Sequence, residues 1–473
     1  MPEKISIFWF RQDLRLADNP GLTAAATAAE VLPVYILDDM SPKEWATGAA
    51  SRWWLHHSLQ MLSNSLQGRL LILQGNPLQL LPALAEAVNA KSVHWNRCYE
   101  SWRINLDTQL KQILLHRDID CSSHKGTLLW EPWQVLKADG SPYKVFTPFF
   151  NRACQTIPEP RQPLPPPQPL DIHLYTGSGV KIEDLALLPE PDWTEGLART
   201  WQHGETAAQQ VLDDFVSSGL DNYRDGRDYP ALRAVSRLSP YLHSGELSPH
   251  QVWCQVHQES QSRGLEHQGE HFLRELAWRE FSYYLLYHFP QLSSENLQAK
   301  FDGFPWREDK KAFKLWTSGV TGYPIVDAGM RELWQTGYMH NRVRMIVASF
   351  LVKNLMIHWR HGAAWFWDCL VDADLANNSA SWQWVAGSGA DAAPYYRIFN
   401  PVTQSKKFDA QGLYIRKFVP ELAALPDKYI HDPGNAPVEV LQRARVQLGD
   451  NYPAPCIDLK TSRIRALEAF KAL

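Results

Sequence analysis

The sequence predicts a doubly wound, parallel α/β domain at the N-terminus followed by an almost all-α domain. Two patterns carry this prediction. Short β-rich segments alternate with helical patterns up to about residue 130, and the apolar spacing is helical from about residue 204 onward. The length of 473 residues, with 45% hydrophobic and 21% charged residues, is enough for two or three domains with sizeable cores.

The first domain is expected over residues 1–130 and contains five candidate strands. They are residues 5–10, 31–37, 69–74, 92–95 and 119–122. Residues 77–90 and 101–117 read as amphipathic helices between strands, and such alternation is typical of a parallel sheet. No GxGxxG or GxxxxGK[ST] motif occurs, so the domain lacks the marks of a standard dinucleotide or nucleoside triphosphate site.

A linker is expected over residues 131–203, and it includes the proline-rich segment 157–170. Proline has no amide proton and a restricted φ angle, so this segment cannot form a helix or a central strand. The second domain is expected over residues 204–473. Its helical patterns cover residues 271–289, 326–338 and 340–362.

The net charge of -4 argues against binding nucleic acid by overall charge, so a DNA partner has to meet a local basic patch. The predicted helix between Tyr338 and His361 offers one, because it contains no Asp or Glu. Its basic residues are His340, Arg342, Arg344, Lys353, His358, Arg360 and His361. They alternate with apolar residues, and a buried arginine needs a carboxylate or phosphate partner.

Six cysteines are scattered without a metal-ligand spacing, which fits reduced thiols in a cytoplasmic protein. No segment is apolar enough to span a bilayer, so we expect no membrane partner. The segment HQGEH, residues 267–271, has the histidine spacing of some zinc peptidases. Gly269 weakens the helix that such a site requires, and we expect no metal.

The most informative segment is residues 371–404, which combines carboxylates, amides, tryptophans and a Gly-Ser-Gly turn. It is too rich in polar groups for plain packing, and a cofactor or substrate would satisfy them. Several of the 20 tryptophans also fall between Trp359 and Trp384. A single tryptophan is usually a packing residue, whereas a cluster favours a functional role.

Six segments in order along the chain resemble the successive signatures of the photolyase and cryptochrome family. They are residues 9–20, 237–249, 278–281, 321–331, 340–345 and 371–404. The resemblance covers essentially the whole chain. It implies an N-terminal domain that helps to hold a light-harvesting antenna and a helical domain that binds FAD in a U shape.

The resemblance also implies the flavin contacts. They are Tyr223, Val235, Ser236, Arg237, Leu238, Ser239, Phe272, Arg344, Asp372, Ala373, Asp374 and Asn378. Backbone amides where a loop enters a helix suit the pyrophosphate. Arg344 is expected to pair with Asp372 beside the isoalloxazine, and Asn378 to face its N5 atom.

Damaged DNA is the partner that the resemblance implies, and we expect the chain to act on it as a monomer. The implied DNA contacts are Arg227, Glu275, Trp278, Arg279, Ser282, Asn341, Arg342, Trp384 and Gln404. Arg227 and Arg342 would bind phosphates without reading sequence. Trp278 and Trp384 would stack on a flipped pyrimidine dimer, whose opening costs least at a damaged pair.

The implied catalytic residues are Glu275, Trp278, Met345 and Asn378. In the family's mechanism, excited and fully reduced FAD donates an electron to the dimer, the cyclobutane ring splits and the electron returns. Glu275 would hydrogen-bond the pyrimidine edge. Trp306, Trp359 and Trp382 match the family's chain that carries electrons inward to reduce oxidised flavin.

Some residues depart from the family pattern. Val235 replaces a common threonine, and Phe272 and Tyr338 stand where many bacterial relatives carry Trp. Trp102 and Arg103 occupy positions where one bacterial subgroup binds folate through an Asn-Glu pair. The identity of the antenna chromophore is therefore left open, with folate, a deazaflavin and a second flavin as the candidates.

Three functions remain: a cyclobutane dimer photolyase, a six-four photolyase and a signalling cryptochrome. Met345 favours the first over the second, because six-four enzymes place a catalytic histidine there and a thioether cannot transfer protons. The sequence ends at Leu473 without the long tail of many cryptochromes. Asn378 also favours repair, since plant receptors usually carry an acid at that position.

Overall fold

The computed structural model describes residues 4–27, 29–392 and 396–473, and the chain forms two compact units. Unit 1 comprises residues 1–221, 236–290 and 371–376, and unit 2 comprises residues 222–235, 291–370 and 377–473. Neither unit is one continuous segment. The domain limits expected near residues 130 and 204 stay predictions.

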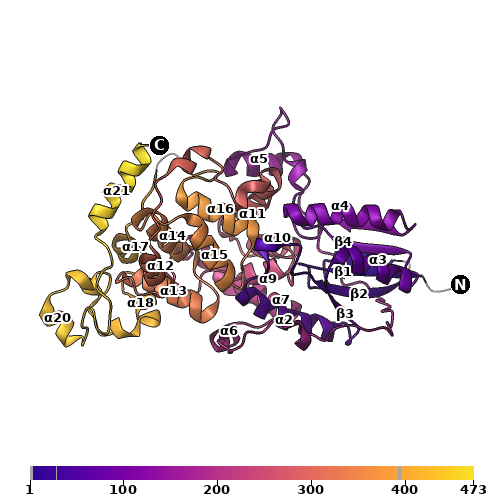
Figure 1. Cartoon of the computed structure of the whole chain (residues 1–473), viewed down its shortest axis with the longest axis horizontal. Helices are drawn as coiled ribbons and strands as arrows, with labels where there is room; N and C mark the ends of the chain where they lie inside the picture. The colour runs from indigo at the N-terminus through magenta and orange to yellow at the C-terminus, as the bar shows by residue number, and fades with distance from the viewer. Residues whose placement is uncertain (1–3, 28, 393–395) are drawn as a thin grey trace. The chain divides into compact units, whose positions relative to one another are not determined.

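Unit 1 contains a parallel sheet of five strands in the order β3-β2-β1-β4-β5 (Figure 1). Its strands are β1 (Ile5–Phe10), β2 (Glu30–Leu37), β3 (Leu71–Gln74), β4 (Ser92–Asn96) and β5 (Asp120–His124). All five predicted strands are confirmed, with limits that differ by two residues or fewer. The order reverses between β1 and β4, which is the arrangement of a doubly wound fold.

Alternate residues of β1 enter two separate hydrophobic cores, because successive side chains of a strand point to opposite faces. Ile7 and Trp9 pack with α3 (Pro77–Ala87) and α4 (Ser101–Leu115). Phe8 and Phe10 pack with α1 (Pro20–Ala26) and α2 (Ala49–Ser65). Helices therefore cover both faces of the sheet, which explains why its strands are almost uniformly apolar.

The rest of unit 1 consists of helices and long irregular segments. Its helices are α5 (Phe146–Thr156), α6 (Glu195–Thr200), α7 (Glu205–Asp214), α9 (Ser239–Ser244), α10 (Pro249–Ser262) and α11 (Glu266–His288). The proline-rich segment 157–170 contains neither helix nor strand, as predicted. A buried carboxylate, Glu246, connects α2 with the end of α9 by accepting hydrogen bonds from Trp54 Nε1 (3.1 Å), Ser58 Oγ (2.6 Å) and Ser244 Oγ (2.9 Å).

The described part of unit 2 contains helices and no strand. Its helices are α8 (Tyr223–Gly226), α12 (Lys310–Thr317), α13 (Pro324–Thr336), α14 (Asn341–Ser349), α15 (Trp359–Cys369), α17 (Pro401–Phe408), α18 (Leu413–Phe418), α19 (Asp427–Ile430), α20 (Val438–Arg443) and α21 (Leu459–Lys471). Most of α16 (Leu375–Ala386) also belongs to it.

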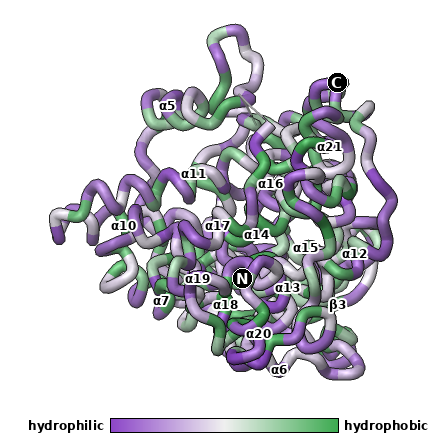
Figure 2. Tube along the Cα trace, turned by 90° about the vertical axis from the view of Figure 1, so that its left-hand side faces the viewer, coloured by the Kyte–Doolittle hydropathy of each residue, from purple (hydrophilic) through white to green (hydrophobic). Residues whose placement is uncertain are grey.

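Hydrophobic and hydrophilic residues alternate along the helices of the chain (Figure 2). Among the described residues, no helix is both long enough and apolar enough to cross a membrane.

The prediction of a single helix over residues 340–362 is wrong, because the structure has two helices in this segment. After α14 the chain makes one π-helical turn, Phe350–Asn354, and Met356 then adopts a left-handed backbone conformation with φ of 57°. A new helix, α15, begins after His358, whose Nδ1 accepts a hydrogen bond from the Arg360 amide at 3.1 Å. The apolar spacing continues across the break, so periodicity alone did not reveal it.

Histidine caps both helices of this region. His340 Nδ1 accepts from the Arg342 amide at 3.2 Å at the start of α14, as His358 does at α15. Burial, with help from neighbouring cationic groups, lowers the pKa of each imidazole to about 4. Both rings are therefore neutral at physiological pH, which leaves each Nδ1 free to accept the capping hydrogen bond.

The free energy of unfolding should decrease as the pH falls from about 6.5 to about 4. Both imidazoles are neutral in both states above this window; within it the unfolded chain binds protons that the folded chain does not. His358→Asn keeps a capping acceptor but does not titrate. Its stability should therefore depend less on pH, by about 1 to 3 kcal/mol across the window once the partial exposure of the ring is allowed for. Urea unfolding at several pH values measures this.

The matched control is His116→Asn, at an exposed histidine that follows α4. It removes an imidazole that caps neither α14 nor α15, so it tests whether the loss of any histidine has the same effect. An equal pH dependence in His358→Asn and the wild type would contradict the capping role of the neutral imidazole.

Candidate functional site

The loop at residues 372–374 is held inside unit 1 by hydrogen bonds to two helices. Asp372 Oδ2 accepts from Ser239 Oγ of α9 at 2.6 Å, and Asp374 Oδ2 accepts from the Tyr283 hydroxyl of α11. His243 Nδ1, near the end of α9, lies 3.7 Å from the same oxygen of Asp374. The loop, α9 and α11 therefore form one connected group of predicted flavin residues.

Asp374 is ionised in this environment although it is 7% exposed. Burial by itself would raise the pKa of this carboxyl. The contacts with His243 and Tyr283 and the nearby charge of Arg279 outweigh burial and lower the pKa to about 2. The loop thus carries a permanent negative charge whose hydrogen-bond partners hold it in place.

The other predicted flavin residues of unit 1 lie on α11 and on the turn before α9. Arg237 in this turn has a left-handed backbone with φ of 55°, and its guanidinium lies 4.5 Å from the centre of the Trp201 ring. Leu238 is buried beside it, and Ser236 Oγ accepts from the Leu238 amide at 3.5 Å. Phe272 of α11 is buried and packs against Phe215 at 4.7 Å between ring centres.

Four predicted flavin residues belong to unit 2: Tyr223, Val235, Arg344 and Asn378. Arg344 Nε donates to the Met339 carbonyl at 2.7 Å. Asn378 Nδ2 donates to the Ala363 carbonyl at 3.0 Å, which orients the carboxamide. The expected pairing of Arg344 with Asp372 joins residues of different units and stays a prediction.

This set of donors and acceptors fits a flavin dinucleotide. The Ser236 hydroxyl, which accepts from the Leu238 amide and keeps its own proton to donate, and the Arg237 guanidinium suit an anionic pyrophosphate. The buried carboxylates of Asp372 and Asp374 suit donors on a ribityl chain or ring.

Helix α11 carries four of the predicted DNA contacts. Glu275, Trp278 and Ser282 lie on one face of it, at spacings of three and four residues. Trp278 stacks on Phe146 of α5 with 3.9 Å between ring centres, and Ser282 Oγ donates to the Trp278 carbonyl at 3.0 Å. Arg279 has an 11% exposed side chain and pairs with Glu280 at 3.0 Å, so its DNA contact stays a prediction.

The predicted DNA contacts of unit 2 centre on α14. Asn341 is exposed there, and Arg342 and Met345 are half-buried. Arg342 pairs with Asp228 at 2.7 Å, and its guanidinium lies 4.4 Å from the Phe408 ring centre, so it connects α14 with α17. Arg227 lies 5.5 Å from the Tyr223 ring centre.

Two further predicted contacts of unit 2 are half-buried: Gln404 on α17 and Trp384 on α16. Trp384 Nε1 donates to the Asp391 carbonyl at 3.2 Å. Residues 393–395 of the informative segment lie outside the described residues.

The three predicted relay tryptophans all belong to unit 2. Half-buried Trp306 reaches Trp359 through His358, with ring centres separated by 4.9 Å and 5.6 Å. Trp359 and Trp382 are almost fully buried, at 1% and 2% exposure. Trp382 packs so closely on α15 that a Cβ at Gly362, one turn after Trp359, would lie 2.1 Å from its ring.

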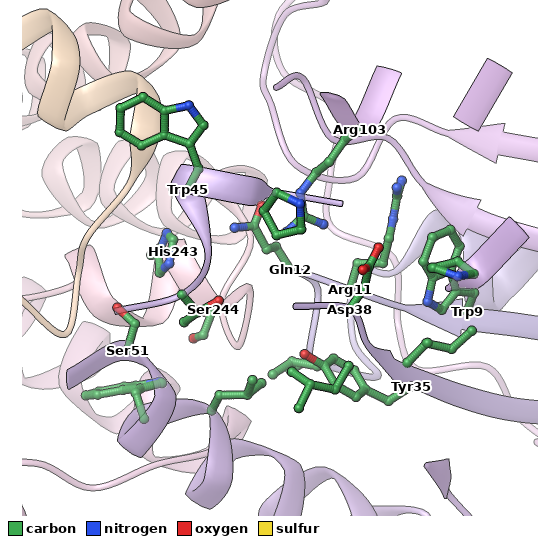
Figure 3. A pocket seen from close by; sticks show the side chains of 18 of the residues that line it. Trp9, Arg11, Gln12, Tyr35, Asp38, Trp45, Ser51, Arg103, His243 and Ser244 are labelled. Carbon is green, nitrogen blue, oxygen red and sulfur yellow. The ribbon is translucent and has the colours of Figure 1, made fainter. Parts of the chain in front are cut away.

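A pocket in unit 1 opens at the carboxyl ends of β1 and β2. Arg11 follows β1 and Asp38 follows β2, and both line the pocket (Figure 3). Aromatic side chains that also line it are Trp9, Tyr35, Trp45, Trp54 and Trp102. This is the edge of the sheet at which doubly wound folds bind ligands.

Five buried polar atoms of residues that line the pocket have no hydrogen-bond partner among the described residues: Trp9 Nε1, Arg11 Nε, Asp38 Oδ2, Arg103 Nε and His243 Nδ1. Unpaired buried polar groups are costly and suggest a ligand. Sequence-based reasoning did not single out Arg11, Asp38 or His243, all of which line the pocket. The position of Arg11 and Asp38 directly after predicted strands was the signal that could have identified them.

Two family models match the chain over most of its length: "DNA photolyase" at residues 6–168 and "FAD binding domain of DNA photolyase" at residues 272–472. A deoxyribodipyrimidine photo-lyase of Agrobacterium fabrum is 48% identical over 99% of this chain and 98% of its own. The chain belongs to the DNA photolyase family. Arabidopsis thaliana cryptochrome-2 is also similar, at 38% identity over 98% of this chain and 78% of its own.

Solved structures agree with this membership. A class III photolyase from Agrobacterium tumefaciens covers 100% of this chain and 98% of its own, with a TM-score of 0.95 and 48% identity. An archaeal photolyase from Sulfolobus tokodaii with two FAD molecules covers 99% of this chain and 100% of its own, with a TM-score of 0.82 and 28% identity. The predicted fold class and the predicted FAD-binding domain are therefore confirmed.

Proposed function

We propose that this protein repairs cyclobutane pyrimidine dimers in DNA with the energy of light. The observation that carries the choice of lesion is Met345, half-buried on α14 one turn after the exposed Asn341. A thioether neither donates nor accepts a proton in acid-base catalysis, so a lesion that needs proton transfer at this position is disfavoured. A cyclobutane ring opens by electron transfer alone.

Residues of α11 bind the lesion in this proposal. Trp278 offers a flat apolar surface for a flipped pyrimidine pair, and Glu275, one turn earlier, accepts hydrogen bonds from a pyrimidine edge. Arg342 and Arg227 of unit 2 bind phosphates of the DNA backbone. These cationic contacts supply affinity without sequence preference, as a repair enzyme requires.

FAD, when bound and reduced, supplies the electron that light transfers to the lesion. Hydrogen bonds within the chain fix the positions of two of the predicted flavin residues. Asp374, ionised and bonded to Tyr283, fixes the 372–374 loop, and Asn378 is oriented by its bond to Ala363. Because this bond uses the amide nitrogen of Asn378, its Oδ1 oxygen is able to accept a hydrogen bond from a protonated ring nitrogen.

Reduced protein under blue light should restore thymines from an oligonucleotide that contains a cyclobutane dimer, and should leave a six-four photoproduct unchanged. Glu275→Gln should lower the repair yield by about tenfold, because a charged hydrogen-bond acceptor is lost. Glu270→Gln, at an exposed position of the same helix, should repair as the wild type does. Chromatography of the products measures all three.

If dimers persist while the protein holds reduced FAD, the repair proposal is wrong and a cryptochrome-type receptor becomes the better explanation. Repair of the six-four photoproduct would instead overturn the argument from Met345.

We also propose that Trp306, Trp359 and Trp382 carry electrons inward to reduce oxidised FAD. Trp306→Phe should abolish photoreduction but leave repair by chemically reduced protein intact, since phenylalanine is far harder to oxidise. Absorption changes under blue light measure the first activity and dimer repair measures the second. Trp334→Phe, at a 54% exposed tryptophan outside this chain of three, is the control and should reduce normally. Loss of both activities in Trp306→Phe would contradict the relay.

The pocket of unit 1 is our proposed site for the antenna chromophore. The N–H groups of Trp9, Arg11 and Arg103 and the carboxylate oxygen of Asp38, which have no hydrogen-bond partner, suit a planar heterocycle with adjacent carbonyl and N–H groups. The aromatic lining of the pocket suits the ring faces. Folate, deazaflavin and flavin chromophores all share such an edge, so their absorption spectra have to distinguish them.

Asp38→Asn should reduce the amount of this second chromophore per FAD at least several-fold. Asp38 Oδ1 accepts from the Met40 and Ser41 amides, which an asparagine oxygen can retain, whereas the unpaired Oδ2 becomes a donor. Asp39→Asn, next to it but outside the pocket lining, should bind the chromophore normally. Absorption spectra of the purified proteins measure the ratio, and equal ratios in both variants would exclude this pocket.

A further inference from the structure

Trp278 is the end of a stack of three aromatic rings in unit 1. Its ring is nearly parallel to that of Phe146, with 3.9 Å between centres and 10° between planes. Phe146 is in turn stacked on Phe150, at 5.7 Å and 15°. The guanidinium of Arg274, one turn before Trp278 on α11, lies 5.4 Å from the Phe146 centre and 5.0 Å from the Phe150 centre.

Helix α5, which supplies the two phenylalanines, is fixed against α11. Phe149 is 1% exposed and packs on Phe281 and Tyr284, with ring centres 5.1 Å and 4.7 Å apart. The Tyr143 amide, just before α5, donates to the Tyr284 hydroxyl at 2.8 Å. Phe146 itself is 2% exposed, so it cannot move aside without disturbing this packing.

These contacts leave one face of Trp278 unstacked within the described chain. Phe146 covers one face, and Phe281 meets the ring edge-on at 5.8 Å and 77°. No further ring contact or side-chain hydrogen bond of Trp278 occurs among the described residues, and the residue is half-buried. A large apolar ring is thus stacked on a buried ring by one face, while no second ring of the described residues stacks on its other face.

We propose that Phe146 is a positioning residue for lesion recognition, acting through Trp278. Phe146 fixes the indole in one orientation before DNA arrives, so less conformational freedom is lost when a flipped pyrimidine pair stacks on the other face. This inference rests on the proposed function and deepens it. It assigns to α5, which carries none of the predicted site residues, a role in discriminating damaged from undamaged DNA.

Phe146→Leu tests the proposal, because leucine keeps an apolar side chain in the core but has no flat face. We expect the Kd for a dimer-containing duplex to rise roughly three- to tenfold, which corresponds to the free energy of one aromatic stacking contact. The Kd for undamaged duplex and the FAD content should stay unchanged. Phe146→Tyr retains the ring and should restore tight binding. Phe150→Leu removes a ring that does not touch Trp278 and should bind as the wild type does.

A double-mutant cycle separates positioning from a general loss of structure. In a Trp278→Ala background, Phe146→Leu should weaken dimer binding no further, since its effect passes through the indole. A further loss of the same size in that background would overturn the proposal. If Phe146→Leu is too unstable to purify, Phe146→Met makes the same comparison with an unbranched side chain.

A spectroscopic signature reports on the indole without DNA. In protein labelled with 5-fluorotryptophan, the ¹⁹F resonance of Trp278, assigned through Trp278→Phe, should shift and broaden in Phe146→Leu but not in Phe150→Leu. An unchanged resonance would overturn the proposal. The proposal would also be overturned if wild-type protein binds dimer-containing DNA more tightly than undamaged DNA and Phe146→Leu binds the dimer with the same Kd as the wild type. Wild-type protein that does not discriminate dimers from undamaged DNA would instead refute the proposed function itself, and this inference with it.

Discussion

The hydrogen bond that the buried carboxylate of Asp374 accepts from Tyr283 is the interaction on which the arrangement of the predicted sites of unit 1 depends. The carboxylate accepts from Tyr283 of α11 and lies next to His243 of α9, so it connects the 372–374 loop to two helices. Its pKa is lowered to about 2, which means that the charge persists across the physiological range. Without it, the buried Tyr283 hydroxyl would lose this hydrogen bond and the loop would lose its attachment to α11.

This attachment couples sites that are far apart in the sequence. Helix α9 begins with Ser239, which bonds Asp372, and the last turn of the same helix lines the pocket. Helix α11 carries Tyr283 together with two predicted lesion contacts, Glu275 and Trp278. On the proposed function, the flavin loop, the pocket wall and the lesion-binding face therefore share one packed framework.

Much of the fold could be predicted from the sequence because local patterns decide it. The alternation of strands and helices identified the sheet, and the proline-rich segment identified an irregular connection. The break between α14 and α15 could not be predicted, because it depends on the left-handed backbone of Met356 and on a histidine cap, neither of which changes the apolar spacing. For the site, motifs supplied the predicted residues, which stay predictions, but the contacts of Trp278 with Phe146 and of Asp374 with Tyr283 join distant segments and required the structure.

On the proposed function, the ion pair between Arg342 and Asp228 explains how a chain with a net charge of -4 would favour damaged DNA. Arg342 has an 18% exposed side chain, so a phosphate that approaches it competes with a carboxylate already 2.7 Å away. This competition weakens binding to any DNA backbone, whether damaged or not. In this proposal, stacking on Trp278 is gained only with a flipped lesion. On the proposed function, weak phosphate contacts and a strong stacking contact together raise the ratio of damaged to undamaged DNA bound.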